Sequence, residues 1–387
     1  MLTRALDTNI PKGVHRLAVG SFFFLQGLSF ASWGSRIPTV QQKLGLSEAE
    51  LGGVLFSLPV GLMVSLPIAG WLIAKVGSRK VVISALLVYA VTLVTIGFSQ
   101  NTLQLMACLF VFGLAGNMVN ISVNTQAVGV ETLYSKSIMA SFHGLWSLAG
   151  FIGAAIGTMM IGNEVMPSQH FLLIMGITIV GVLIGSRYVL REDISTGEDT
   201  PIFAKPDKSL LLLGLVAFCA MICEGAMFDW SGVYFKNVLQ VDKSLIGAGY
   251  TAFMFTMASG RFVADWFTSR FGLKSILQLS GVLIAVGLLI SVVFPHLFTA
   301  ITGFLLVGAG VSSVVPLIYS AAGKSKVMSP GSALAAVSSI SFLGFLLGPP
   351  VIGLVAGATS LRVSFTIIAF MGFCITILAS KSKSLES

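Results

Sequence analysis

Charged residues are scarce in this sequence. Asp, Glu, Lys and Arg make up 10% of the 387 residues, whereas 55% are hydrophobic and the mean hydropathy is +0.94. A soluble globular protein carries about 25% charged residues, so there is too little charge here to cover a surface that faces water. The composition therefore indicates a protein that crosses a membrane many times.

Cysteine and histidine are also rare, with four of each. The cysteines lie in apolar runs without a CxxC pair or a histidine at ligand spacing, so neither a disulfide framework nor a metal site is expected. Cys219 and Cys223 share a helix face, but two thiols alone make a poor site and small apolar packing is the expectation. The sequence also has no nucleophile–base pair and no nucleotide-binding loop, so we expect no enzyme, no ATP-driven pump and no cofactor.

The sequence is instead rich in long apolar runs. A membrane span needs about 20 apolar residues, and with its loop roughly 30, so the length predicts about twelve spans. The one sustained polar stretch, residues 191–208, is interpreted as a solvated linker. The predicted fold is an all-α polytopic membrane protein with helices at residues 14–41, 49–74, 81–98, 103–130, 138–161, 171–190, 210–238, 245–266, 275–293, 298–321, 333–355 and 363–379.

Lysine and arginine are distributed unequally between the predicted loops. Only Arg36, Lys43, Lys236, Lys243 and Arg362 lie on one side, and the other eighteen of the 23 lie on the side of both termini. Cytoplasmic loops carry the excess of positive charge, so both termini are predicted in the cytoplasm. The net charge of +8 is explained by these loops, and no nucleic-acid partner is expected.

The two halves of the sequence repeat each other at a spacing of about half the chain. Ser147–Phe151 reads SLAGF and Ser341–Phe345 reads SFLGF, and the Lys75-x-Gly77 turn returns as Arg270-x-Gly272. We therefore predict an N-terminal six-helix bundle over residues 1–190, a cytoplasmic linker at 191–208 and a C-terminal bundle over 209–387. Parallel repeats of this kind suit alternating access, in which two halves move about a site between them.

Polar side chains recur on one face of several predicted spans. Asn117, Asn120 and Asn124 lie within about 60° of one another around a helix, and His143 and Trp146 share a face of the next. Their expected surroundings are a wet cavity, the alternative being hydrogen bonds between helices. Gln26, Trp33 and Arg36 form a further stripe, in which a tryptophan, like Trp230, either stacks on a sugar ring or anchors the helix at the membrane interface. Arg36 either pairs with an acid in an outer gate, binds an anionic substrate or is simply solvated.

Two acids lie clearly within a predicted span, away from its ends, which is costly in lipid and therefore suggests function. Glu224 and Asp229 are five residues apart, about 140° around the helix, so they are expected in different surroundings. Either one could bind solute hydroxyls or carry a coupling proton, or make a structural hydrogen bond. His143 is a second candidate for proton carriage, because histidine titrates near physiological pH.

The turn KVGSRK at residues 75–80, preceded by Gly70, resembles the cytoplasmic loop signature of the major facilitator superfamily. The sequence departs from that signature at Ala74, where the family has an aspartate. The counterpart in the second half keeps an acid, Asp265. The resemblance implies gating roles for Lys75, Arg79, Asp265 and Arg270.

Within that superfamily, three segments resemble the YbjJ-like branch of bacterial permeases, which is related to fucose permeases. They are residues 124–131, residues 141–147 and residues 224–231. The branch often has an aspartate where Asn120 stands. The resemblance implies a monomeric carrier of small solutes, often sugars, driven by the proton gradient. The leading hypothesis is thus a secondary transporter of a small polar solute, with a drug or metabolite exporter and a non-transporting sensor as alternatives.

Overall fold

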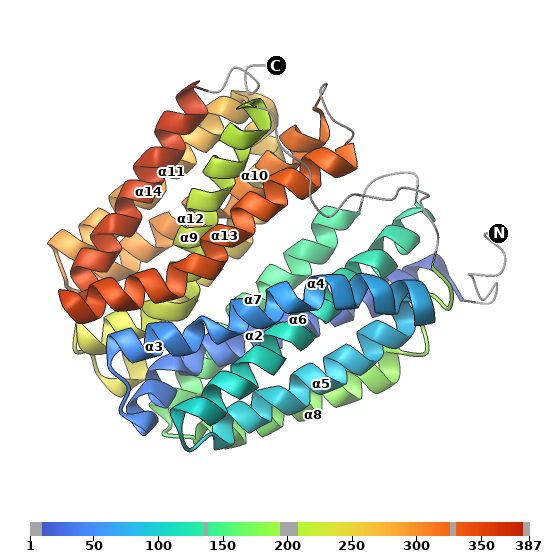
Figure 1. The fold of residues 1–387 in the computed structure, drawn as a ribbon, viewed down its shortest axis with the longest axis horizontal. Coiled ribbons are helices and arrows are strands. Elements are labelled where there is room, and N and C mark those ends of the chain that lie inside the picture. Colours follow the sequence, from blue (N-terminus) through green and yellow to red (C-terminus); the bar gives the residue numbers. More distant parts are fainter. Residues whose placement is uncertain (1–9, 135–137, 194–207, 326–329, 382–387) are drawn as a thin grey trace. The chain divides into compact units, whose positions relative to one another are not determined.

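The computed structural model describes residues 10–134, 138–193, 208–325 and 330–381, apart from the side chains of residues 265, 330 and 331. All regular elements within these ranges are helices (Figure 1). The predicted all-α membrane fold is thereby confirmed. Residues 194–207 of the predicted linker lie outside the described residues, so the linker stays a prediction.

The chain divides into two units, one comprising Met1–Gly45 with Val54–Thr196 and the other Leu46–Gly53 with Gly197–Ser387. The first unit contains α2 (Lys12–Leu44), α4 (Ser57–Val76), α5 (Ser78–Phe98), α6 (Thr102–Glu131), α7 (Met139–Gly162) and α8 (Pro167–Gly185). The second contains most of α3 (Glu48–Leu55), then α9 (Lys208–Asn237), η1 (Lys243–Leu245), α10 (Ala248–Phe271), α11 (Leu273–Val293), α12 (Leu297–Gly323), α13 (Pro330–Ala358) and α14 (Leu361–Lys381).

In the described part of the chain, eleven helices are long and apolar enough to cross a membrane. The second of these combines α3 and α4, which are separated only at Phe56. The remaining predicted span corresponds to α10, which carries Arg261, Asp265 and Arg270. These charges lower its hydropathy below that of a plain apolar span.

The same helix pairs pack together in both units. In the first unit α2 packs on α7 and α8, α4 on α6, and α5 on both α6 and α8. In the second unit α9 packs on α13 and α14, α10 on α12, and α11 on both α12 and α14. Each pair in the first list has its counterpart in the second, which is the arrangement that the sequence repeat predicts.

Glycines show the repeat at the level of single residues. Gly77, between α4 and α5, has φ +86°, and Gly272, between α10 and α11, has φ +79°. This backbone conformation favours glycine. A Cβ on Gly113 of α6 would overlap the carbonyl of Leu58 in α4, and a Cβ on Gly308 of α12 would overlap that of Phe253 in α10. The two helix pairs therefore approach closely in the same way.

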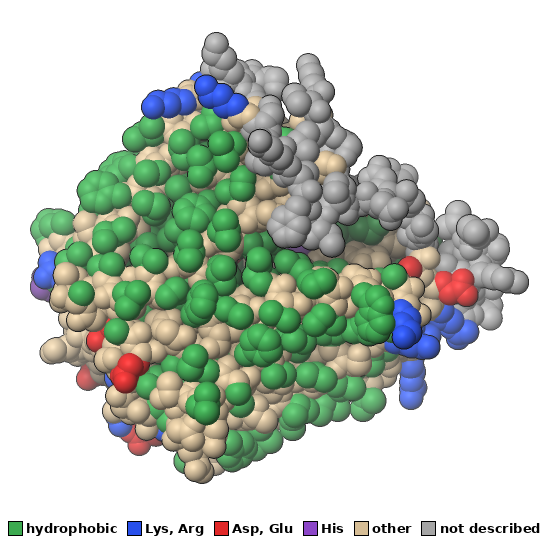
Figure 2. Space-filling model, viewed as in Figure 1, with side chains coloured by type: hydrophobic (Ala, Val, Ile, Leu, Met, Phe, Trp, Pro, Cys, Tyr) green, Lys and Arg blue, Asp and Glu red, His purple; other side chains and the backbone are tan. Residues whose placement is uncertain are grey.

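Large apolar side chains are exposed along the flanks of both units. Leu183 is 62% exposed on α8, Phe262 61% on α10 and Phe370 57% on α14. On the face shown in Figure 2, hydrophobic side chains cover the middle of the view and most charged ones lie near its edges. Such an apolar exterior is stable in lipid rather than in water.

Candidate functional site

Three polar side chains on α6 and α7 remain accessible although they lie on apolar spans. Asn120 and His143 are exposed and Asn124 is half-buried. The Asn124 side-chain amide donates to Asn120 Oδ1 at 2.8 Å, and the His143 ring meets Phe23 of α2 edge-on, with centroids 5.3 Å apart. We call Asn120, Asn124 and His143 the polar wall of the first unit.

Helix α2 contacts both helices that carry the polar wall, α6 and α7. Gln26 of α2 donates from Nε2 to the carbonyl of Gly116 on α6 at 2.9 Å, one helical turn before Asn120. Phe23, one turn before Gln26, contacts His143 on α7. Gln26 itself is 7% exposed, so in this structure it joins helices. Trp146 is half-buried beside Phe30, with ring centroids 6.0 Å apart.

Asn117 lies on the same side of α6 but is covered by α4. Its side chain is 6% exposed and donates to Ser65 Oγ at 2.7 Å and to the Leu62 carbonyl at 3.2 Å. It therefore makes the helix-to-helix hydrogen bonds that the sequence left open as an alternative. The predicted stripe is accessible only where α4 leaves α6 uncovered.

Trp33 and Trp230 are buried within their respective units, at 1% and 0% exposure. Neither indole Nε1 has a hydrogen-bond partner among the described residues. A fully buried ring can neither stack on a solute from this position nor anchor a helix at the lipid headgroups. In this structure both tryptophans are therefore packing residues, and neither expected role is open to them.

Arg36 is buried, with 1% of its surface exposed. The expectation of a solvated arginine is therefore wrong. Its Nε donates to His170 Nδ1 on α8 at 3.2 Å and its second amino group to the Val165 carbonyl at 2.9 Å. Within the described residues no carboxylate pairs with it. An imidazole that accepts this bond carries its own proton on Nε2, and this atom is buried without a partner. The sequence analysis did not identify His170, because nothing in the sequence connects this residue to Arg36.

Glu224 of α9 forms an ion pair with Arg261 of α10, at 3.4 Å between Oε1 and the guanidinium. The side chains are 9% and 18% exposed. Arg261 thus pairs with an acid of a neighbouring helix, so it does not count towards the loop charge that indicates orientation. The sequence offered one signal for this pair, since an acid buried in lipid calls for a cation nearby.

Asp229, five residues further along α9, has no such partner. Its residue is 9% exposed, and no hydrogen bond or ion pair to it exists among the described residues. Tyr250 on α10 interacts electrostatically with this carboxylate, and its own hydroxyl is buried without a partner. Tyr250 was missed because a single tyrosine in an apolar run carries no signal.

The predicted gating turns show one acid that the sequence did not indicate. Asp193 Oδ2 accepts from the Ser78 backbone N–H at 2.7 Å, and its Oδ1 accepts from the Ser78 hydroxyl. Gln126 of α6 donates to the same hydroxyl at 2.7 Å. This carboxylate satisfies the first N–H of α5, where the helix dipole favours negative charge. It lies beside the turn in which Ala74 replaces the family aspartate.

The cations of these turns are mostly exposed. Lys75 lies over the Trp71 ring at 4.7 Å, and Arg79 donates to the Ser186 carbonyl at 2.9 Å. Arg270 is exposed at the end of α10. The side chain of Asp265 lies outside the described residues, so its predicted role stays a prediction.

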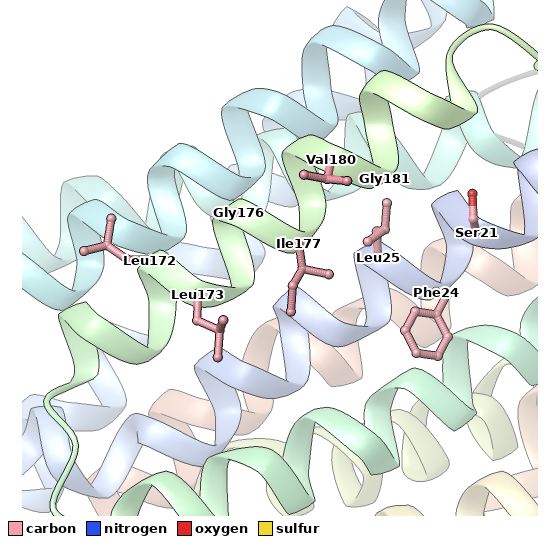
Figure 3. A pocket seen from close by; sticks show the side chains of 9 residues that line it. All are labelled: Ser21, Phe24, Leu25, Leu172, Leu173, Gly176, Ile177, Val180 and Gly181. Carbon is pink, nitrogen blue, oxygen red and sulfur yellow. The ribbon is translucent and has the colours of Figure 1, made fainter.

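The first unit also has a hollow of about 770 Å³ between α2 and α8 (Figure 3). Its lining is apolar except for Ser21, whose hydroxyl is already bonded to the Ala18 carbonyl at 2.7 Å. A polar solute would find no hydrogen-bond partner there. This hollow is suited to lipid chains, and the polar wall on α6 and α7 is the better candidate for solute binding.

Comparisons with known proteins identify the family of this chain. The family model described as Major Facilitator Superfamily matches residues 19–322 and 213–383. An uncharacterised MFS-type transporter of Yersinia pestis is 32% identical over 360 residues, which is 92% of each chain.

Two solved structures are similar in fold. The nucleoside transporter NupG has a TM-score of 0.75 at 13% identity, covering 95% of this chain and 99% of that one. The E. coli fucose:proton symporter FucP has a TM-score of 0.62 at 18% identity, covering 95% and 98%. The two structures show the fold alone, whereas the family model and the Yersinia pestis relative show that the chain belongs to the major facilitator superfamily of membrane transporters.

Proposed function

We propose that the protein is a secondary active transporter of a small, hydroxyl-rich solute, a sugar or a related compound, coupled to protons. The observation that carries this proposal is the polar wall. Asn120, Asn124 and His143 expose amide and imidazole groups on helices that are otherwise apolar. Amides both donate and accept hydrogen bonds, as neutral solutes with several hydroxyl groups require.

Two further features support the proposal. The acids Glu224 and Asp229 on α9 provide carboxyl groups within the membrane, where a proton can be bound and released. NupG and FucP are named for nucleosides and fucose, which are ring compounds rich in hydroxyl groups. Their identity to this chain transfers only the fold, so the solute class rests on the polar wall.

The proposal extends to the setting of the transporter. It places the chain in a bacterial inner membrane as a monomer with both termini in the cytoplasm, within the YbjJ-like, fucose-permease-related branch. Residues 1–190 and 209–387 would move as two bundles in alternating access. Lys75, Arg79, Asp265 and Arg270 would then act at the gating turns.

Binding is tested first, by the thermal stability of the purified protein against a panel of neutral sugars. A ligand that binds only the folded protein raises the Tm with its concentration. We expect stabilisation by at least one sugar, and Asn120→Ala should abolish this stabilisation without lowering the Tm of the free protein. The matched control is Asn163→Ala, because Asn163 is exposed at the end of α7 and away from the wall. Stabilisation by hydrophobic cations alone would identify an exporter instead.

Transport is then tested in proteoliposomes with an imposed pH gradient. The stabilising sugar should accumulate in response to the gradient and carry protons with it. Sugar binding without flux in these vesicles would contradict transport and indicate a sensor. Flux that is independent of the gradient would contradict proton coupling alone.

A further inference from the structure

The two acids of α9 have different chemical surroundings. Glu224 pairs with Arg261 at 3.4 Å, so its negative charge is balanced within the chain. This pair joins α9 to α10. Breaking it would separate two largely desolvated charges, which is costly. Glu224 is thus held by a fixed cation.

Asp229 has neither a cation nor a hydrogen-bond donor among the described residues. It is 9% exposed. Its carboxylate oxygens are not among the enclosed, unpartnered atoms of the described residues. The group is therefore largely dry yet still reachable from open space. A buried carboxylate without a partner takes up a proton or a cation from outside.

Tyr250 of α10 packs beside the residue that precedes Asp229 in the chain. Its hydroxyl is buried without a partner, and its ring packs edge-on against Phe228, with centroids 6.3 Å apart. Phe228 in turn packs edge-on against Phe253 at 5.7 Å. Three aromatic rings of α9 and α10 thus fix the tyrosine next to the residue that precedes Asp229.

The other charged groups around α9 leave Asp229 without a competing partner. On α10, Arg261 holds Glu224, and on α14, Arg362 donates twice to the Val292 carbonyl at 2.7 and 3.1 Å. Helix α12 carries no charged residue, nor does the sequence of α13. Lys236 lies two turns beyond Asp229 at the end of α9, and Glu48 of α3 accepts from Asn237 at 3.0 Å.

We propose that Asp229 with Tyr250 is the coupling-proton site, and that the Glu224–Arg261 pair is a fixed tie between α9 and α10. This assignment rests on the proposed function. A proton from water forms an O–H bond with the Asp229 carboxylate and leaves a neutral acid, and the same proton later returns to water. Tyr250 is a positioning residue in this proposal, because its unpartnered hydroxyl interacts electrostatically with the Asp229 carboxyl group.

Infrared spectroscopy tests this assignment without knowledge of the solute. The full chain in lipid vesicles is titrated from acid to alkaline pH, and the carbonyl stretching band of protonated carboxyl groups is followed. We expect one component of that band, belonging to a dry carboxylic acid, to vanish as the pH rises. Asp229→Asn should remove this component, whereas the matched variant Glu224→Gln should retain it.

Tyr250→Phe keeps the acid and most of the aromatic packing, and removes only the hydroxyl. We expect the component to persist in this variant at a shifted frequency, because the hydrogen bonding of the carboxyl group changes. An unshifted band would overturn the role of Tyr250. A component that is lost in Glu224→Gln and kept in Asp229→Asn would overturn the assignment of Asp229. A component that responds to sodium instead of pH would overturn the choice of ion.

The fate of the proposed function can be separated from this result. If the component behaves as expected but no solute is carried, the transport proposal fails and the proton site stands. If solute-driven proton flux persists in folded Asp229→Asn, the proton site fails and the transport proposal stands. The Tm of each variant shows whether it is folded.

Discussion

Asn117 and Asn120 are nearly one turn apart on α6, yet their surroundings differ. The first is bonded to α4 and the second is exposed. At the scale of single residues, the neighbouring helix decides whether a polar group stabilises the fold or remains available to a solute. Arg36 and His143 show the same contrast, since the arginine is enclosed between helices and the histidine is exposed.

Replacement of Asn117 by alanine should destabilise the first unit. The change removes the two hydrogen bonds that Asn117 donates to α4, at a cost of about 1 kcal/mol, because hydrogen bonds between membrane helices are individually modest. We expect a lower Tm in detergent and unchanged sugar affinity at temperatures where the variant is folded. The opposite result, weaker binding with an unchanged Tm, would place Asn117 on the polar wall.

Replacement of His170 by alanine should also lower the Tm. Arg36 would lose one of its two acceptors, and a buried unsatisfied donor costs about 1–3 kcal/mol. His170→Gln should retain more of the stability, because its amide oxygen can accept a hydrogen bond from the guanidinium. His143→Ala serves as the control and should leave the Tm nearly unchanged. Equal Tm losses in His170→Gln and His170→Ala would show that the imidazole contributes only by packing.

At the scale of elements, close approach of helix backbones determines the shape of each unit. Gly113 on α6 and Gly308 on α12 occupy equivalent positions, and each faces a carbonyl of the helix packed against it. Small residues permit such approach in membrane helices. Close packing of α4 on α6 and of α10 on α12 thus depends on a glycine at equivalent positions, Gly113 and Gly308.

Gly113→Ala and Gly308→Ala should therefore impair folding to a similar degree. Overpacking typically costs about 1–3 kcal/mol, so we expect a lower Tm and a lower yield of folded protein. Gly176→Ala is the matched control, because a Cβ there would meet no atom within 4 Å. A drop in Tm for Gly176→Ala as large as for the other two would mean that glycine content, rather than close approach, is responsible.

At the scale of the whole molecule, the arrangement of loops relative to the membrane follows from charge. Removal of Arg261 from the loop cations leaves seventeen of the 23 basic residues on the side of the termini. The asymmetry therefore survives the correction, and the predicted orientation is unchanged.

A reporter joined to the C-terminus tests this orientation. A fluorescent protein that folds only in the cytoplasm should fluoresce there, and alkaline phosphatase at the same place should be inactive. A second fusion, in the predicted outer loop at Asn163, should give the reverse pattern. Phosphatase activity at the C-terminus would contradict the orientation and require a different number of spans.

The sequence by itself determined the spans and their repeat, because lipid selects helices by apolar length and this property is summed along the chain. Helix α10 was found in this way despite its charges. The tertiary structure alone decided the polar contacts. Glu224 meets Arg261, Arg36 meets His170, and α4 covers Asn117, since such contacts depend on the depth and angle at which distant helices pack. Hydropathy and periodicity indicate which face of a helix is polar, but only its neighbour determines what that face touches.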